Sequence, residues 1–79
     1  MPRFFFNIRR HDSSDLDMEG SDLPDLDTAR REAMVSLRQF IADVARGSRI
    51  VGVEQIEITD ADGKVLAVVW WTDAMQSLR

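Results

Sequence analysis

The chain has 79 residues, no cysteine and a single histidine, and its formal net charge is −4 at pH 7. This length predicts one small domain with a modest core, and the composition excludes disulfides and cysteine-based metal sites. The negative charge argues against a nucleic-acid partner, because phosphates require a basic surface.

The N-terminal segment MPRFFFNIRR alternates in a way that predicts a strand over residues 1–9. Phe4, Phe6 and Ile8 share one face of this strand, and Phe5 lies on the other face. The segment has no long apolar region followed by a cleavage site, so it is not typical of a signal peptide. No apolar stretch approaches the roughly 20 residues that span a bilayer. We therefore expect a soluble cytoplasmic protein with no membrane partner.

The next part of the chain is strongly acidic, with no Lys or Arg between Asp12 and Asp27. A weak strand is predicted over residues 16–23, although Gly20 and the acids are poor strand formers. Such a strand belongs at the edge of a sheet, where charges deter pairing with other sheets.

A long amphipathic helix is predicted over residues 26–46. Pro24 keeps the preceding residue extended, and Asp25, or alternatively Asp27, suits the N-cap. Gly47 suits the left-handed residue that follows a helix. Steps of three and four trace one apolar stripe, which contains Leu26, Ala29, Ala33, Leu37, Phe40, Ile41 and Val44.

A β-hairpin is predicted over residues 50–59 and 64–71, and Gly52 is a candidate for a bulge. The turn Asp60-Ala61-Asp62-Gly63-Lys64 is typical of a three-residue loop with its glycine in the left-handed region. The tail, residues 72–79, is expected to form a short helical turn or to be disordered.

The register of this hairpin predicts which side chains face the helix. Pairing Asp60 with Lys64 places Ile58 opposite Leu66, Ile56 opposite Val68 and Glu54 opposite Trp70 on the helix side. The opposite face then holds the pairs Thr59–Val65, Glu57–Ala67, Gln55–Val69 and Val53–Trp71. A register shift of one residue would move the side chains of the shifted strand to the opposite face of the sheet.

These elements predict an α+β fold with the order β-β-α-β-β, in which one long helix packs on one face of a mainly antiparallel sheet. The whole chain, residues 1–79, forms a single domain in this prediction.

Three blocks of the sequence are similar to a small bacterial family, found often in alphaproteobacteria, that is known as domain of unknown function DUF6894. They are residues 1–9, residues 17–33 and residues 56–66. The resemblance implies a compact bacterial cytoplasmic domain and carries over no activity. Residues 11–15 depart from it, because similar sequences have a short Asp-Gly turn there. Residues 23–33 also resemble HicB-type antitoxins, although this chain lacks their DNA-binding segment.

The acidic segment holds the candidate metal ligands. Asp15, Asp17 and Glu19 copy the first alternate positions of a calcium loop. The twelfth position is Leu26, where such a loop needs a bidentate Glu. We therefore favour a solvated acidic loop and predict no metal or cofactor.

No catalytic set is evident. His11 is followed by Asp12, but a general base needs a positioned partner and a pocket. Ser13 and Ser14 lack the context of an activated nucleophile. The arginines of the predicted helix are interpreted as a solvated face. We predict that the protein is not an enzyme.

The apolar face opposite the helix is the strongest functional signal, because a small monomer rarely leaves such a patch exposed. The predicted interface consists of Phe5, Val53, Val65, Val69 and Trp71. The primary hypothesis is an interaction module that forms a homodimer through this face. The alternatives are that the tail covers the face, that the chain is an antitoxin-like partner of another small protein, or that it binds a small ligand or metal.

Overall fold

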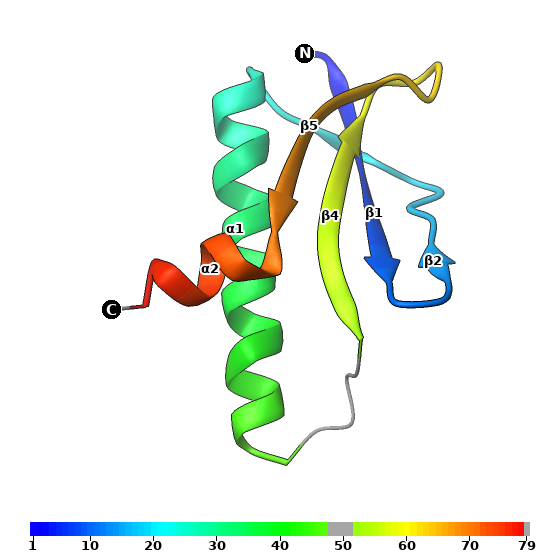
Figure 1. The fold of residues 1–79 in the computed structure, drawn as a ribbon. Helices are drawn as coiled ribbons and strands as arrows, with labels where there is room; N and C mark the ends of the chain where they lie inside the picture. Colours follow the sequence, from blue (N-terminus) through cyan, green and yellow to red (C-terminus); the bar gives the residue numbers. More distant parts are fainter. Residues whose placement is uncertain (48–51, 79) are drawn as a thin grey trace.

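The computed structural model describes residues 1–47 and 52–78. Its elements are, in order, β1 (Arg3–Arg10), β2 (Ser14–Asp15), β3 (Ser21–Asp22), α1 (Leu26–Ala45), β4 (Val53–Thr59), β5 (Val65–Trp70) and α2 (Trp71–Gln76). The predicted α+β class is confirmed, since an antiparallel sheet carries one long helix on one face (Figure 1). The first two residues of the predicted strand 50–59, and Arg79, lie outside the described residues.

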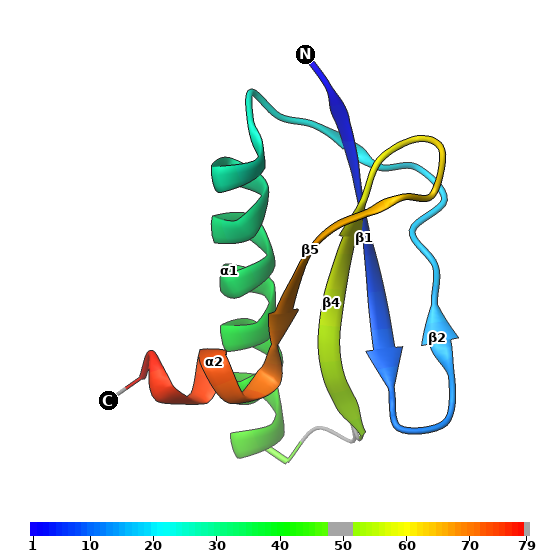
Figure 2. The same cartoon turned by 45° about the horizontal axis from the view of Figure 1, so that its top comes forward.

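The sheet has the order β2-β1-β4-β5, and β3 pairs with β1 as well. Figure 2 shows the same side-by-side arrangement of β5, β4, β1 and β2. The prediction of a strand over residues 16–23 is wrong for residues 16–20, which leave the sheet between the two short strands. β2 pairs with the end of β1 at Ile8 and Arg9, and β3 pairs with its start at Arg3 and Phe4. The second strand is therefore two short pieces separated by a loop.

Helix α1 begins at Leu26, as predicted, and ends at Ala45, one residue before the predicted end, with Arg46 as its C-cap. The Asp25 carboxylate accepts hydrogen bonds from the hydroxyl of Thr28 at 2.7 Å and from its backbone N–H at 2.8 Å. These two bonds lower the pKa of Asp25 and satisfy one of the free donors of the first turn. At the other end, Gly47 has the left-handed φ of 94° that a helix termination favours.

The core lies between α1 and the sheet. Ala29, Ala33 and Leu37 are fully buried on the predicted apolar stripe of the helix. The sheet contributes the buried side chains Phe4, Val53, Ile56, Ile58, Ala67 and Val69. Because two of the three buried helix residues are alanines, the helix backbone can approach the sheet closely.

The predicted register of the hairpin is wrong beyond its first pair. Thr59 pairs with Val65 as predicted, but Ile58 pairs with Ala67, so Leu66 is an extra residue that forms a bulge in β5. Such an insertion shifts every following side chain to the other face. Ala67 and Val69 consequently enter the core, whereas Val68 and Trp70 face outward. The small Ala67 and Val69 are therefore buried, and the large Trp70 is half exposed.

A second irregularity places Val53 in the core. β1 pairs Arg9 with Gln55 and Arg10 with Val53, so Glu54 is the extra residue. Val53 is therefore buried beneath the helix rather than on the opposite face, where its predicted pair with Trp71 had placed it.

The tail forms helix α2, which packs against α1 and not over the sheet face opposite α1 (Figure 1). Ala74 is fully buried. The guanidinium of Arg38 on α1 donates to the hydroxyl of Ser77 at 2.9 Å. Trp71, the first residue of α2, is half-buried and packs against the core. In the described part of the chain, no helix is long and apolar enough to cross a membrane.

Truncation of Ile58 to alanine tests this core. Ile58 is fully buried, so the I58A variant should lose about 2–5 kcal/mol of unfolding free energy through lost burial and a residual cavity. Urea denaturation followed by circular dichroism measures the loss. The V35A variant is the control, because Val35 on α1 is 57% exposed and its truncation should change stability by no more than about 0.5 kcal/mol. Equal losses in the two variants would contradict the assigned core.

Candidate functional site

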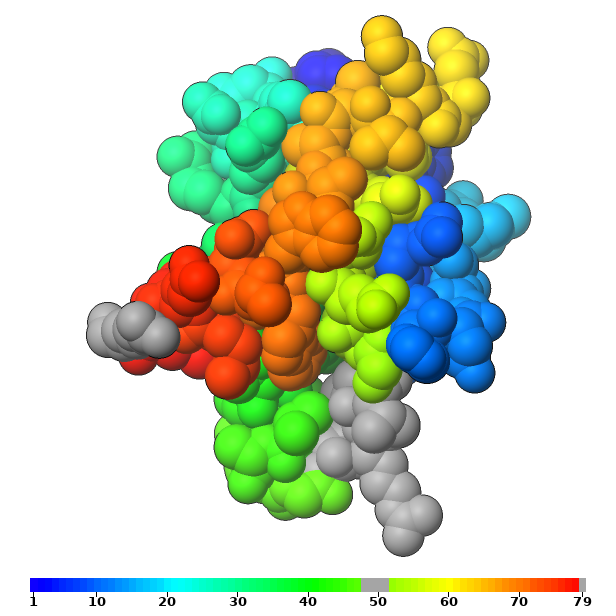
Figure 3. Space-filling model, in the orientation of Figure 1, coloured from blue at the N-terminus to red at the C-terminus, as the bar shows by residue number. Residues whose placement is uncertain are grey.

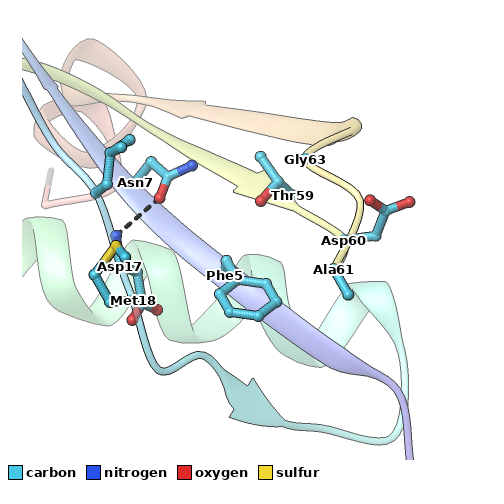
Figure 4. A pocket seen from close by; sticks show the side chains of 9 residues that line it. Phe5, Asn7, Asp17, Met18, Thr59, Asp60, Ala61 and Gly63 are labelled. Atoms are coloured by element: carbon cyan, nitrogen blue, oxygen red, sulfur yellow. Dashed lines mark hydrogen bonds between the residues drawn. The ribbon is translucent and has the colours of Figure 1, made fainter.

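The sheet face opposite α1, here called the outer face, carries an open hollow of about 420 Å³. Its lining comes from β1, from the loop between β2 and β3, and from the β4–β5 turn. Figure 4 shows the ring of Phe5 between the Asp17–Met18 segment and the turn at Asp60 and Ala61, with the helix behind the sheet. The lining residues are Phe5, Asn7, Leu16, Asp17, Met18, Thr59, Asp60, Ala61 and Gly63.

Residues 16–20, here called the arch, are anchored to β1 by Asp17. The carboxylate of Asp17 accepts the backbone N–H of Phe6 at 3.1 Å. In return, the side-chain oxygen of Asn7 accepts the backbone N–H of Asp17 at 2.9 Å. This reciprocal pair replaces the strand pairing that the arch lacks, and it attaches the arch to the middle of β1.

The same carboxylate closes the arch itself. It accepts the backbone N–H groups of Glu19 at 3.1 Å and of Gly20 at 3.0 Å. Partial burial opposes ionisation of Asp17, but the hydrogen bonds from Gly20, Phe6 and Glu19 together outweigh it and lower the pKa. Asp17 is thus an ionised structural anchor.

Gly20 allows the arch to lie directly on β1. Its φ of 73° is left-handed, and a Cβ atom there would approach the Phe5 ring and the Arg3 side chain to 2.8 Å each. Both the conformation and the contact require glycine. The arch backbone consequently covers part of Phe5, which is half-buried.

The three candidate metal ligands have separate roles. Asp15 forms an ion pair with Arg10 at 2.8 Å, Asp17 accepts backbone N–H groups, and the Glu19 side chain is exposed. Within residues 1–47 and 52–78, no group of three or more His, Cys, Asp or Glu side chains could hold a metal ion.

His11 lies beyond the end of β1, away from the lining of the hollow. Its side chain is 85% exposed, and its Nδ1 lies 3.9 Å from a carboxylate oxygen of Glu54. The arrangement provides neither a pocket nor a short hydrogen bond of the kind a general base uses.

Two polar groups of the hollow have unused hydrogen-bonding capacity. Thr59 is 5% exposed, and its hydroxyl, which has no hydrogen-bond partner among the described residues, is not fully buried. The side-chain nitrogen of Asn7 also lacks a partner within the described part of the chain, because the only bond of that amide uses its oxygen. The alternation of β1 and β4, which places Asn7 and Thr59 on the same face as Phe5, was the signal in the sequence that could have identified these residues.

The outer face also holds a row of apolar side chains on β5, here called the β5 row: Val65, Val68 and Trp70. Val65 is 47% exposed and Trp70 is 50% exposed, while Val68 is half-buried. In the space-filling view, β5 (orange), β4 and β1 lie at the surface with no helix passing over them (Figure 3).

Of the five predicted interface residues, the structure leaves two on the outer face. Val65 belongs to the β5 row, and Phe5 lines the hollow. Val53 and Val69 are core residues, and Trp71 packs against the core. Val68 and Trp70 were missed because the bulge at Leu66 exchanges the faces of β5.

The comparisons with known proteins give one result. The model of the family described as Domain of unknown function (DUF6894) matches residues 3–69. Neither the comparison with curated proteins nor the comparison with solved structures found a match.

Replacement of Asp17 by alanine tests the anchor. The D17A variant leaves the N–H groups of Phe6, Glu19 and Gly20 without their acceptor, so its unfolding free energy at pH 7 should fall by about 1–3 kcal/mol. Because the fold lowers the pKa of Asp17, this contribution is complete above the pKa of an unfolded Asp, about 3.9. It is lost as the pH falls through the lower pKa of the folded state.

Urea denaturation of wild type and variant between neutral and strongly acidic pH measures the effect, and the two stabilities should converge in acid. E19A is the matched control, since the neighbouring Glu19 carboxylate has no hydrogen-bond partner among the described residues. A difference that persists unchanged at acidic pH would show that Asp17 does not act through its charge.

Proposed function

The chain belongs to the family described as Domain of unknown function (DUF6894), and from that premise we propose that it is a small interaction module that forms a homodimer through β5. The observation that carries this proposal is an uncharged apolar strand at an edge of the sheet. The bacterial cytoplasmic setting implied by the sequence resemblance is part of the same proposal.

The two edges of the sheet are built differently. The edge formed by β2 and β3 is divided into two-residue strands, and both contain an aspartate. Short charged strands of this kind are typical of edges that do not pair with another chain. β5 lacks this protection along most of its length, because VLAVVW contains no charged residue and no proline; only its last N–H, that of Trp70, is engaged, by the Asp73 carboxylate. An edge of this composition favours the addition of another strand.

The backbone of β5 is suited to such pairing. The N–H of Trp70 donates to the Asp73 carboxylate at 3.3 Å, at the start of α2, and so points away from β4. Since backbone groups alternate along a strand, the N–H and C=O of Val68 point to the same open side. A second β5 could pair there in an antiparallel arrangement about a two-fold axis, which makes the contact self-complementary.

The side chains support the same contact. Antiparallel pairing would bring two β5 rows side by side, so that Val65, Val68 and Trp70 contact their copies across the new strand pair. Each such cross-strand pair of apolar side chains contributes roughly 0.2–1 kcal/mol. Because β5 is uncharged, two chains of net charge −4 can meet there without like charges facing each other across the contact.

A charge placed on the edge should abolish this association. Val68 lies outward on β5, so V68K would bring the ammonium groups of the two copies close together across the proposed strand pair, where like charges repel. Light scattering coupled to size-exclusion chromatography should give twice the mass of one chain for the wild type at micromolar concentration, and the mass of one chain for V68K.

The V35K variant is the control, because it makes the same change at an exposed valine of α1 and should remain dimeric. Circular dichroism spectra that match the wild type would show that both variants are folded. A wild type that stays monomeric at high micromolar concentration would refute the proposal, and so would equal dissociation of the two variants.

A further inference from the structure

We propose that the hollow on the outer face binds a short basic peptide segment of another protein, anchored by one apolar side chain. The hollow lies between β1, the arch and the β4–β5 turn. None of the β5 row residues lines the hollow. The proposal is therefore independent of the homodimer contact through β5.

The apolar walls of the hollow provide a place for an anchor side chain. Phe5 forms the floor, and Leu16 and Met18 stand on the arch at 66% and 84% exposure. The hydrogen bonds of Asp17 hold the backbone between these two side chains in place. Exposure of two large apolar side chains on an anchored segment is typical of a contact surface, and a methionine adapts to partners of different shape.

The polar groups of the hollow match a peptide backbone. The hydroxyl of Thr59 and the side-chain nitrogen of Asn7 both lack partners among the described residues. Each can donate a hydrogen bond to a carbonyl oxygen. Thr59 is 5% exposed. Because no fully buried side-chain oxygen or nitrogen of the described residues lacks a partner, its unpaired hydroxyl is the part that reaches solvent, where a ligand can meet it.

The charges around the hollow favour a basic partner. The two segments that frame it, residues 16–20 and 59–64, contain the acids Asp17, Glu19, Asp60 and Asp62 and one basic residue, Lys64. Arg3 also reaches the arch, where it donates to the backbone carbonyl of Glu19, but its charge is paired with Asp22. The carboxylates of Asp17 and Asp60 are already bonded to backbone N–H groups. Those of Glu19 and Asp62 are not engaged in any hydrogen bond with the described residues, so they can pair with lysine or arginine side chains.

The same charges argue against a second copy of this chain as the occupant. Each copy carries a net charge of −4, and a face-to-face contact at the hollow would bring its acidic rims together. A cationic segment from a different protein is attracted by these acidic side chains. Its binding should weaken as the salt concentration increases, because salt screens the attraction.

Fluorescence anisotropy with a labelled peptide library tests the proposal on the full chain. The library contains short peptides with Lys or Arg around one central Leu, Ile, Phe or Trp. Saturable binding at micromolar concentration is expected, and it should weaken with salt. Two comparison libraries, one with Glu in place of Lys and Arg and one with Gly at the centre, should bind at least tenfold more weakly.

Three variants assign the binding to the hollow. T59V keeps the shape of the buried side chain and removes its hydroxyl, so it should weaken binding roughly three- to tenfold. D62K reverses an exposed charge between the lining residues Ala61 and Gly63 of the turn and should weaken binding by a similar factor. E32K makes the same reversal on α1, where Glu32 is exposed, and should leave binding unchanged. V68K, which is designed to be monomeric, should still bind the library.

Amide chemical shifts locate the peptide, and those of Phe5, Thr59 and Ala61 should change on its addition. The proposal is overturned if the basic library does not bind, if the acidic or glycine library binds equally well, or if E32K weakens binding as much as D62K. Shifts at the hollow that depend on protein concentration alone would assign it to a second copy and would also overturn the proposal.

Discussion

The insertion of one residue in β5 is the constraint on which the surfaces of this protein depend. Leu66 is accommodated as a bulge between the pairs Thr59–Val65 and Ile58–Ala67. Since side chains alternate between the faces of a strand, one extra residue decides which half of VLAVVW is buried. The small Ala67 and the branched Val69 then fit beneath a helix that contacts the sheet through alanines. Trp70 is left on the outer face, and with it the apolar surface on which the proposed association rests.

Asp17 has a comparable role at the other side of the sheet. One carboxylate accepts three backbone N–H groups, and Asn7 returns a bond to the backbone of Asp17. These bonds let the chain leave the sheet between β2 and β3 without losing its attachment to β1. The arch that results contributes Leu16 and Met18 to the lining of the hollow that Phe5 also lines. An acidic motif that resembles a calcium loop in sequence thus serves as a hydrogen-bonded anchor in the structure.

The outer face divides into two regions of different chemistry. Along β5 the surface is apolar and uncharged, which suits contact between two copies of an acidic chain. Around the hollow the acids of the arch and of the hairpin turn outnumber the single lysine, which suits a basic partner. Both helices pack away from this face (Figure 1). The two proposed contacts could therefore be made at the same time on one molecule.

The amino-acid sequence by itself determined the local features: the alternation of β1, the N-cap at Asp25, the apolar stripe of α1, and the hairpin turn in which Gly63 has a φ of 84°. Each depends on residues within a few positions of one another, so period and turn chemistry were sufficient to predict them. The sequence also identified the family.

Only the tertiary structure decided the two bulges, the burial of Val53 and Val69, the exposure of Trp70 and the place of α2. These depend on how closely the helix approaches the sheet, which is a property of side chains far apart in the chain. Strand pairing likewise brings together the segments that line the hollow, which lie within residues 5–7, 16–18 and 59–63. No local sequence pattern predicts that these segments are neighbours in space.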